Sequence, residues 1–183
     1  MADKTSIIYL IGMPGVGKYT IAKELAKHGY VVCDNQLVNN PIFALLNYDG
    51  FKKIPNSAWD AIGAIRDTVF DFISNETENN YVFTNVLEEN EGDRALFRQV
   101  EQLAAKRNSL FIPVKFSISE EEHIKRMQQP SRLLRFKTIN LEDVNSKEGL
   151  IKCTHPNLLE LDVTNLSPQD VAHNILEHLE NIQ

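Results

Sequence analysis

The chain has 183 residues, a length that suits one compact domain with a single sizeable core. Hydrophobic residues make up 43% and charged residues 24%, which excludes a disordered chain, and no apolar run is long enough to predict a membrane span. The net charge of −6 argues against broad binding to nucleic acid or anionic membranes. With two distant cysteines and no leader-like segment, we expect one cytoplasmic domain spanning residues 1–183, as a monomer or a homodimer.

The first elements alternate between strand and helix. Residues 6–11 form a continuous apolar run that ends at Gly12, which predicts a strand buried on both faces. After a glycine-rich segment, apolar residues recur at helical spacing up to Gly29, which predicts a helix and its end. Residues 30–33 are predicted to form a short second strand, with Asp34 at its carboxyl end.

The region between the second and third strands is predicted to be mainly helical. Ser57 and Asp60 have the spacing of a capping box, which predicts the start of a helix, and residues 49–56 are expected to turn the chain before it. The apolar face of this helix is predicted to consist of Trp59, Ile62, Ile65, Val69, Phe72 and Ile73.

Three further strands are predicted over residues 81–86, 110–116 and 158–163, with helical patterns between and after them. Pro113 has no N–H to donate to a neighbouring strand, so the fourth strand is expected to lie at an edge of the sheet or to carry a bulge there.

Capping patterns mark the last two helices, a Ser-Glu-Glu-Glu capping box at Ser119 and a Ser-Pro pair at Ser167. Strands and helices thus alternate along the whole chain. Such alternation predicts a parallel sheet with helices on both faces, and it places ligands at the carboxyl ends of the strands.

The segment Gly12–Lys18 has the form Gly-x-x-x-x-Gly-Lys at the predicted junction of a buried strand and a helix. Its backbone N–H groups and the start of the helix would point at phosphate oxygens, and Lys18 would neutralise the β and γ phosphates. Tyr19 stands where a magnesium-binding hydroxyl is usual, and the hydroxyl arrives one residue later at Thr20, which is expected to contact an α-phosphate. The alternative is a glycine-rich turn that binds no ligand.

Residues 12–20, Gly-Met-Pro-Gly-Val-Gly-Lys-Tyr-Thr, resemble the Gly-x-Pro-Gly-x-Gly-Lys-x-Thr loop of adenylate kinases and of small-molecule P-loop kinases such as shikimate, gluconate and chloramphenicol kinases. The resemblance implies an α/β fold with three layers, the P-loop NTPase fold, with a five-stranded parallel sheet in the order 2-3-1-4-5. It further implies Mg-ATP as the phosphate donor, an acceptor-binding helical segment at about 35–78 and an arginine-bearing lid at about 129–148.

The resemblance also implies roles for single residues. Asp34 would act as a base toward the acceptor hydroxyl or help to hold Mg²⁺, the alternative being a helix N-cap. Arg132 and Arg135 would enclose the transferring phosphoryl group, the alternative being a solvated basic face. The implied donor-binding residues are Gly12, Met13, Pro14, Gly15, Val16, Gly17, Lys18, Tyr19, Thr20, Arg126 and Thr164.

Acceptor and metal contacts are expected from four residues. Arg66 and Asn85 are candidate acceptor contacts, with a structural ion pair and backbone bonding at the strand end as their respective alternatives. Thr20 and Asp34 are the candidate contacts for Mg²⁺, directly or through water.

These residues favour an ATP-dependent kinase that phosphorylates a hydroxyl of a small-molecule acceptor, with no nucleic-acid or membrane partner. A nucleoside monophosphate kinase is one alternative, but only Lys52, Lys53 and Arg66 supply positive charge between the second and third strands. The other alternative is a nucleotide-binding regulatory protein without phosphotransfer, which would bind nucleotide without depending on Asp34.

Overall fold

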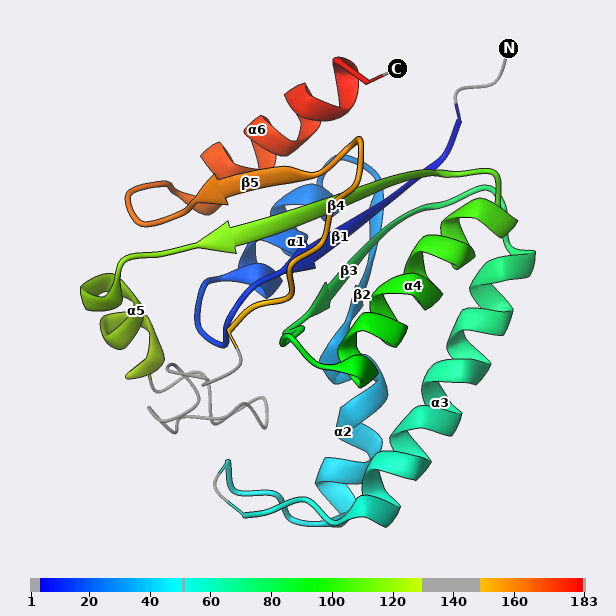
Figure 1. Cartoon of the computed structure of the whole chain (residues 1–183), viewed down its shortest axis with the longest axis vertical. Helices are drawn as coiled ribbons and strands as arrows, with labels where there is room; N and C mark the ends of the chain where they lie inside the picture. Colours follow the sequence, from blue (N-terminus) through cyan, green and yellow to red (C-terminus); the bar gives the residue numbers. More distant parts are fainter. Residues whose placement is uncertain (1–3, 51, 130–148, 183) are drawn as a thin grey trace.

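The computed structural model describes residues 4–50, 52–129 and 149–182. Five parallel strands form one sheet in the order β2-β3-β1-β4-β5 (Figure 1). This order and the parallel pairing confirm the predicted fold class. The strands are β1 (Ser6–Ile11), β2 (Tyr30–Asp34), β3 (Asn80–Asn85), β4 (Leu110–Ser117) and β5 (Leu159–Asp162).

Helices cover both faces of this sheet (Figure 1). α1 and α6 pack on one face, and α3 and α4 pack on the other, so the molecule has three layers. None of the described helices is long and apolar enough to cross a membrane. The helices are α1 (Lys18–Ala26), α2 (Asn35–Leu45), α3 (Asn56–Asn75), α4 (Glu91–Lys106), α5 (Glu120–Met127) and α6 (Pro168–Glu180).

β1 lies in the middle of the sheet, and all six of its residues are buried. Ile8 and Leu10 join the core under α1 and α6, whereas Ile7, Tyr9 and Ile11 join the core under α3 and α4. Each fully buried side chain of this size contributes about 1.5–3 kcal/mol from the hydrophobic effect. The central strand therefore fixes the position of the loop that follows it.

Pro113 lies in β4, which is not an edge strand, so that part of the prediction is wrong. Its register with β1 runs without a bulge, but β5 pairs with β4 only from Val114 onward. The amide of Leu110 points toward β1, so by the alternation of backbone groups the position of the missing N–H faces the β5 side. On that side the carbonyl of Phe111 accepts from the side chain of Asn157 at 3.0 Å. The proline thus occupies a stretch with only one neighbouring strand.

The predicted caps differ in their outcome. Ser119 and Ser167 cap α5 and α6 with their hydroxyls, as predicted, but the full capping box forms at Ser167 and not at Ser119, where it was predicted. Ser57 does not cap α3, because the helix begins directly after Pro55 and no side chain caps it. The pair of Ser57 and Asp60 lies inside the first helical turns instead.

The buried face of α3 is narrower than predicted. Ile62 and Ile73 are buried, but the side chains of Trp59 and Phe72 are 45% and 68% exposed. Neighbouring helical residues point about 100° apart, so Phe72 faces outward where Ile73 faces the sheet.

Residues 149–157 return the chain to the amino edge of the sheet along the face covered by α4. Ile151 is buried in the core of that face, and its amide donates to the carbonyl of Leu87 at 3.0 Å. An antiparallel bridge between Glu88 and Leu150 holds the start of this segment beside the end of β3.

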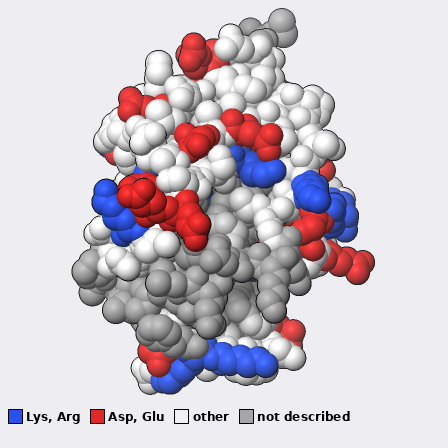
Figure 2. Space-filling model, turned by 60° about the vertical axis from the view of Figure 1, so that its left-hand side comes forward, with Lys and Arg blue, Asp and Glu red and all other residues white. Residues whose placement is uncertain are grey.

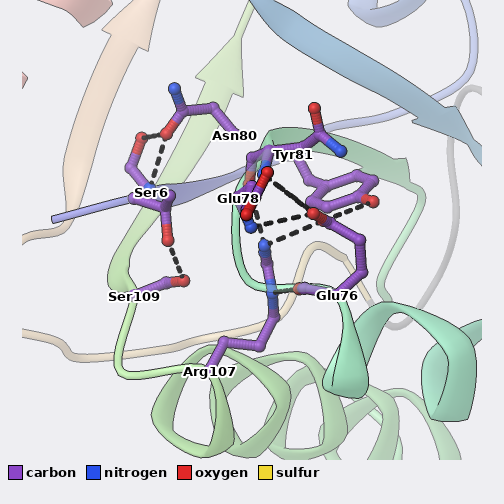
Figure 3. Close-up of polar contacts among 9 residues, drawn as sticks. Ser6, Glu76, Glu78, Asn80, Tyr81, Arg107 and Ser109 are labelled. Carbon is purple, nitrogen blue, oxygen red and sulfur yellow. Dashed lines mark hydrogen bonds and ion pairs between the residues drawn. The ribbon is translucent and has the colours of Figure 1, made fainter.

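At the amino edge of the sheet, Arg107 joins α3, β3 and α4 (Figure 3). Arg107 follows α4 directly and is 4% exposed. Its Nε donates to the carbonyl of Glu76 at 2.7 Å, and its Nη2 donates to the carbonyl of Asn79 at 2.8 Å. The guanidinium also lies 4.7 Å from the ring centre of Tyr81. These contacts tie the end of α3, the start of β3 and the end of α4 together at this edge of the sheet.

We expect Arg107→Ala to lower the free energy of unfolding by about 3 kcal/mol, because two carbonyls lose their donors and a cation–π contact is lost. The midpoint of thermal unfolding should fall by roughly 6–12 °C for a chain of this size. Arg98→Ala is the matched control, since Arg98 is exposed on the same helix. Equal midpoints for the two variants would contradict a structural role of Arg107.

Candidate functional site

The loop between β1 and α1 depends on glycines with a left-handed backbone. Gly15 and Gly17 have φ angles of 94° and 103°, which glycine adopts at little cost and other residues do not. A methyl group on Gly15 would lie 2.8 Å from Sδ of Met127, so α5 packs closely against the loop. Gly17 is the N-cap of α1, and no side chain caps that helix. The predicted phosphate loop thus has the strand, turn and helix start that anion binding requires.

Lys18 is the first residue of α1, and its ammonium group reaches back across the loop. Nζ donates to the carbonyls of Gly12 and Met13, at 2.5 and 3.0 Å. A positive charge therefore lies above the loop, beside the start of the α1 helix dipole. Both favour an anion at this place.

Two side chains of α5 hold the loop from outside. Nε2 of His123 bonds to the carbonyl of Pro14 at 2.5 Å, and the His123 side chain is buried. Arg126 donates to the carbonyl of Val16 at 3.1 Å and to that of Val163, directly after β5, at 3.0 Å. Arg126, a predicted donor contact, thus lies at the loop, and the contact of His123 with the loop was not predicted from the sequence.

A cavity of about 500 Å³ opens at the carboxyl edge of the sheet, a size typical of small-molecule sites. The phosphate loop, the ends of β2 and β3, the end of α5 and the residues around the start of α6 line it together. Its lining includes Pro14 through Ile21, Asp34, Asn35, Gln36, Thr84, Asn85, Val86, Arg126, Gln129, Val163, Leu166, Pro168 and Val171.

Asp34 ends β2 and is 7% exposed. Its carboxylate accepts a short hydrogen bond from Oγ1 of Thr84, its register partner on β3. Asp34 occupies the N-cap position of α2, but its side chain makes no capping bond, so the capping alternative is wrong for the carboxylate. Burial, reinforced by the charge of Asp34, raises the pKa of the Cys33 thiol to about 12. Cys33 is therefore a neutral packing group at physiological pH.

Three further predicted residues lie near the cavity in different ways. Thr20 and Asn85 line it, one from α1 and the other from the end of β3. The hydroxyl of Thr164 is engaged elsewhere: it bonds to Asp162 at 2.5 Å and accepts the amide of Ser119 at 2.8 Å. Only the carbonyl of Thr164 turns toward the site, where it accepts from Arg126 at 3.4 Å.

Arg66 lies on α3, half-buried, and does not line this cavity. Within the described ranges, no hydrogen bond or ion pair joins its guanidinium to another residue, so the structural ion pair considered as the alternative for Arg66 is not formed there. Burial raises the pKa of the Tyr9 phenol, and the nearby charge of Arg66 opposes this effect. The lid arginines Arg132 and Arg135, with nearly all of the expected lid, lie outside the described residues.

Oxygen ligands for a metal ion are present in the cavity wall. No group of three or more His, Cys, Asp or Glu residues is placed to hold a metal within the described part of the chain. Mg²⁺, however, is commonly held by one or two carboxylates together with substrate phosphates and water. The oxygens of Asp34 and Thr20, which both line the cavity, fit that donor set.

Figure 2 shows acidic and basic side chains next to one another over the described part of one face. Among the described residues, Lys115 pairs with Glu160 at 2.9 Å and Lys125 pairs with Glu122 at 3.3 Å. The described part of this face therefore does not present the continuous basic surface on which nucleic-acid binding depends.

Solved structures with the same fold extend over nearly the whole chain. A sugar kinase from Janibacter sp. has a TM-score of 0.65 at 13% identity and covers 96% of this chain and 95% of its own. A gluconokinase from Sinorhizobium meliloti has a TM-score of 0.59 at 18% identity, with 98% and 93% covered. An APS kinase from Mycobacterium tuberculosis, in complex with AMPPNP and APS, has a TM-score of 0.53 at 17% identity, with 97% and 98% covered.

These identities are low, so the likeness establishes the fold, which is that of P-loop kinases. No family model matches the sequence, and no curated protein matches it either.

Proposed function

We propose that the protein is an ATP-dependent kinase that transfers the γ-phosphate to a hydroxyl group of a small molecule. The observation that supports this most strongly is that one cavity is lined by both the phosphate loop and the buried carboxylate of Asp34. Phosphoryl transfer requires little covalent chemistry from a protein. It requires a bound donor, a positioned acceptor and compensation of charge.

The donor would lie with its phosphates in the loop, where the ammonium of Lys18 and the start of α1 meet them. The adenine base of ATP would lie toward Arg126, between the apolar side chains of Val163 and Leu166. Thr164, predicted to contact the donor, would contribute through its backbone only, since its hydroxyl is bonded within its own turn.

The acceptor would enter on the side of β2 and β3. Asp34 would accept the hydroxyl proton or bind Mg²⁺ together with Thr20, and Asn85 would contact the acceptor from the end of β3. Bound Mg²⁺ would neutralise charge on the phosphate oxygens. The lid arginines, Arg132 and Arg135, would complete the enclosure of the transferring group.

The alternatives have weaker support. A nucleoside monophosphate acceptor needs cations, yet Lys52 and Lys53 are exposed, and Lys52 pairs with Asp49 at 3.4 Å. A buried carboxylate beside the phosphate loop that does not cap its helix is suited to accept a proton, which a purely regulatory nucleotide site does not require. Asp34 is such a carboxylate.

A coupled assay of ADP release from Mg-ATP tests the proposal, with sugars, shikimate-like acids, aminoglycosides, nucleosides and nucleotides as acceptors. We expect a hydroxyl-bearing compound to raise ADP release at least about tenfold over hydrolysis without acceptor. Stimulation by nucleoside monophosphates alone would favour the nucleotide kinase. ADP binding without stimulation by any compound would favour the regulatory protein.

A further inference from the structure

His123 is a buried histidine of α5 that bonds to the backbone of the phosphate loop. Its Nε2 lies 2.5 Å from the carbonyl oxygen of Pro14, and its side chain is 4% exposed. A carbonyl oxygen can only accept a hydrogen bond, so Nε2 must carry a hydrogen and donate it. The partner that satisfies this buried ring is therefore a carbonyl in the loop that would hold the phosphates.

This bond fixes the direction of the peptide group between Pro14 and Gly15. The peptide is trans and planar, so its carbonyl and its N–H point in opposite directions. Because the carbonyl of Pro14 points at α5, the N–H of Gly15 points away from α5. Gly15 lines the cavity, whereas His123 lies outside it. The N–H of Gly15 is thus directed into the space where the phosphates would bind.

The loop leaves the amide of Gly15 available for an anion. Pro14 has no N–H, and the amide of Val16 bonds to the carbonyl of Met13 at 3.5 Å. Within the described ranges, the amide of Gly15 donates to no protein atom. A glycine at a φ of 94° has no side chain to restrict its backbone, so its own conformational preference does not hold the peptide in one direction. The contact with His123 supplies that restraint.

α5 can act as a support because contacts outside the loop anchor it. At its start, the amide of Ser119 donates to Oγ1 of Thr164 at 2.8 Å. Near its end, Arg126 donates to the carbonyl of Val163 at 3.0 Å. Both acceptors come directly after β5. The end of β5 therefore fixes the helix, and the helix fixes the ring of His123 against the loop.

We propose, on the basis of the nucleotide site inferred above, that His123 is a positioning residue for phosphate binding. Its Nε2–H holds the loop peptide in the one direction in which the N–H of Gly15 can donate to a phosphate oxygen. Without this bond, the peptide also adopts directions in which the carbonyl of Pro14 faces the phosphates and repels them. The measured affinity falls with the fraction of molecules whose loop is competent to bind. Loss of the bond therefore weakens phosphate binding although His123 does not touch the phosphate.

Calorimetric titration with ADP tests this role by removing or keeping the donor. His123→Phe keeps a ring of similar size but has no N–H, and its affinity for ADP should fall about tenfold if the competent fraction falls to about one in ten. His123→Gln keeps an N–H donor on a side chain of similar reach, so its affinity should stay within about threefold of wild type.

His178→Phe is the matched control. Nε2 of His178 bonds to the carbonyl of Asn157 at 3.1 Å near the end of α6, so this variant loses the same kind of bond away from the loop. Its ADP affinity should equal that of wild type. An equal loss of affinity in His178→Phe and His123→Phe would show that reduced stability is the cause and would overturn the proposal.

The tautomer of His123 supplies a test that does not depend on how any variant folds. Nitrogen NMR spectra of isotope-labelled wild-type protein distinguish a ring nitrogen that carries a proton from one that does not. Nε2 of His123 should carry a proton, in the neutral ring or in the imidazolium. An unprotonated Nε2 cannot donate to Pro14 and would overturn the proposal.

The binding results separate this role of His123 from the nucleotide site on which it rests. Wild-type affinity in His123→Phe would overturn the role. An equal loss in His123→Phe and His123→Gln would also overturn it, because the packing of the ring would then matter and not its donor. In both cases the nucleotide site would stand. If wild-type protein fails to bind ADP, the proposed function fails, and the role of His123 fails with it.

Discussion

Lys18→Ala should lower the affinity for ADP by roughly 10- to 100-fold and abolish measurable phosphotransfer. The ammonium group lies over the loop in which the phosphates would bind, held by the carbonyls of Gly12 and Met13. A hydrogen bond to a charged group contributes roughly 1.5–3 kcal/mol, and about 1.4 kcal/mol corresponds to a tenfold change in the dissociation constant. Calorimetric titration measures the affinity directly, and the rise of the thermal midpoint with Mg-ATP checks it independently.

Lys27→Ala is the matched control for this prediction. It removes the same charge just after α1, where Lys27 is exposed and pairs with Glu24 at 2.5 Å. ADP affinity should remain within about threefold of wild type, since an exposed ion pair contributes little. If Lys18→Ala and Lys27→Ala bind ADP equally well, the loop is not the phosphate site.

Asp34→Asn should lower kcat by roughly 10²–10⁴-fold, the range expected when a general base is lost. ADP affinity should stay within about threefold of wild type, because the loss of a base acts on the transition state and not on the donor. Asparagine keeps an oxygen that can accept a hydrogen bond from the hydroxyl of Thr84, so this hydrogen bond between β2 and β3 should persist. Steady-state kinetics with a responsive acceptor and calorimetric titration with ADP provide the two measurements.

Glu177→Gln, which neutralises an exposed carboxylate on α6, is the control for charge. It should leave both kcat and ADP affinity unchanged. Wild-type turnover in Asp34→Asn would refute the role of this carboxylate. A large loss of ADP affinity in the same variant would instead assign Asp34 to metal or donor binding.

The strands and the loop of the architecture could be predicted because local sequence patterns specify them. The run at residues 6–11 is apolar on both faces of the strand because β1 is covered on both faces, and that condition is visible in the sequence. Glycines 15 and 17 stand where the loop needs a left-handed backbone. The strand order was inferred from the resemblance of this loop to known kinases, since no local pattern specifies which strands are neighbours.

Features that depend on tertiary packing were predicted less well. Pro113 is tolerated because β5 pairs with β4 only from Val114 onward, one residue further along β4. This register is visible only in the assembled sheet. Trp59 and Phe72 were expected to face inward, yet α3 turns from packing on α2 to packing on the sheet along its length. A periodic apolar pattern predicts one buried side along the whole helix, whereas the buried side of α3 changes along its length.

The candidate site, like the fold, was predicted in part. The loop, Asp34, Asn85 and Arg126 were expected, and the structure brings them to one cavity. The contact of His123 with the loop was not expected, because a lone histidine carries no sequence pattern. Nor could sequence distinguish the hydroxyl of Thr164 from a free ligand group, since the bond to Asp162 depends on how the chain turns after β5.

Kinase activity is tested most directly by following the γ-phosphate itself, which does not require the acceptor to be known. Wild-type protein, Lys18→Ala and Asp34→Asn are each incubated with γ-labelled Mg-ATP and a deproteinised small-molecule extract of the cells that make the protein. Wild-type protein should produce a labelled phosphomonoester, and neither variant should produce a detectable amount of it. Label that remains in ATP, appears only as inorganic phosphate, or is transferred equally by Asp34→Asn would contradict this prediction.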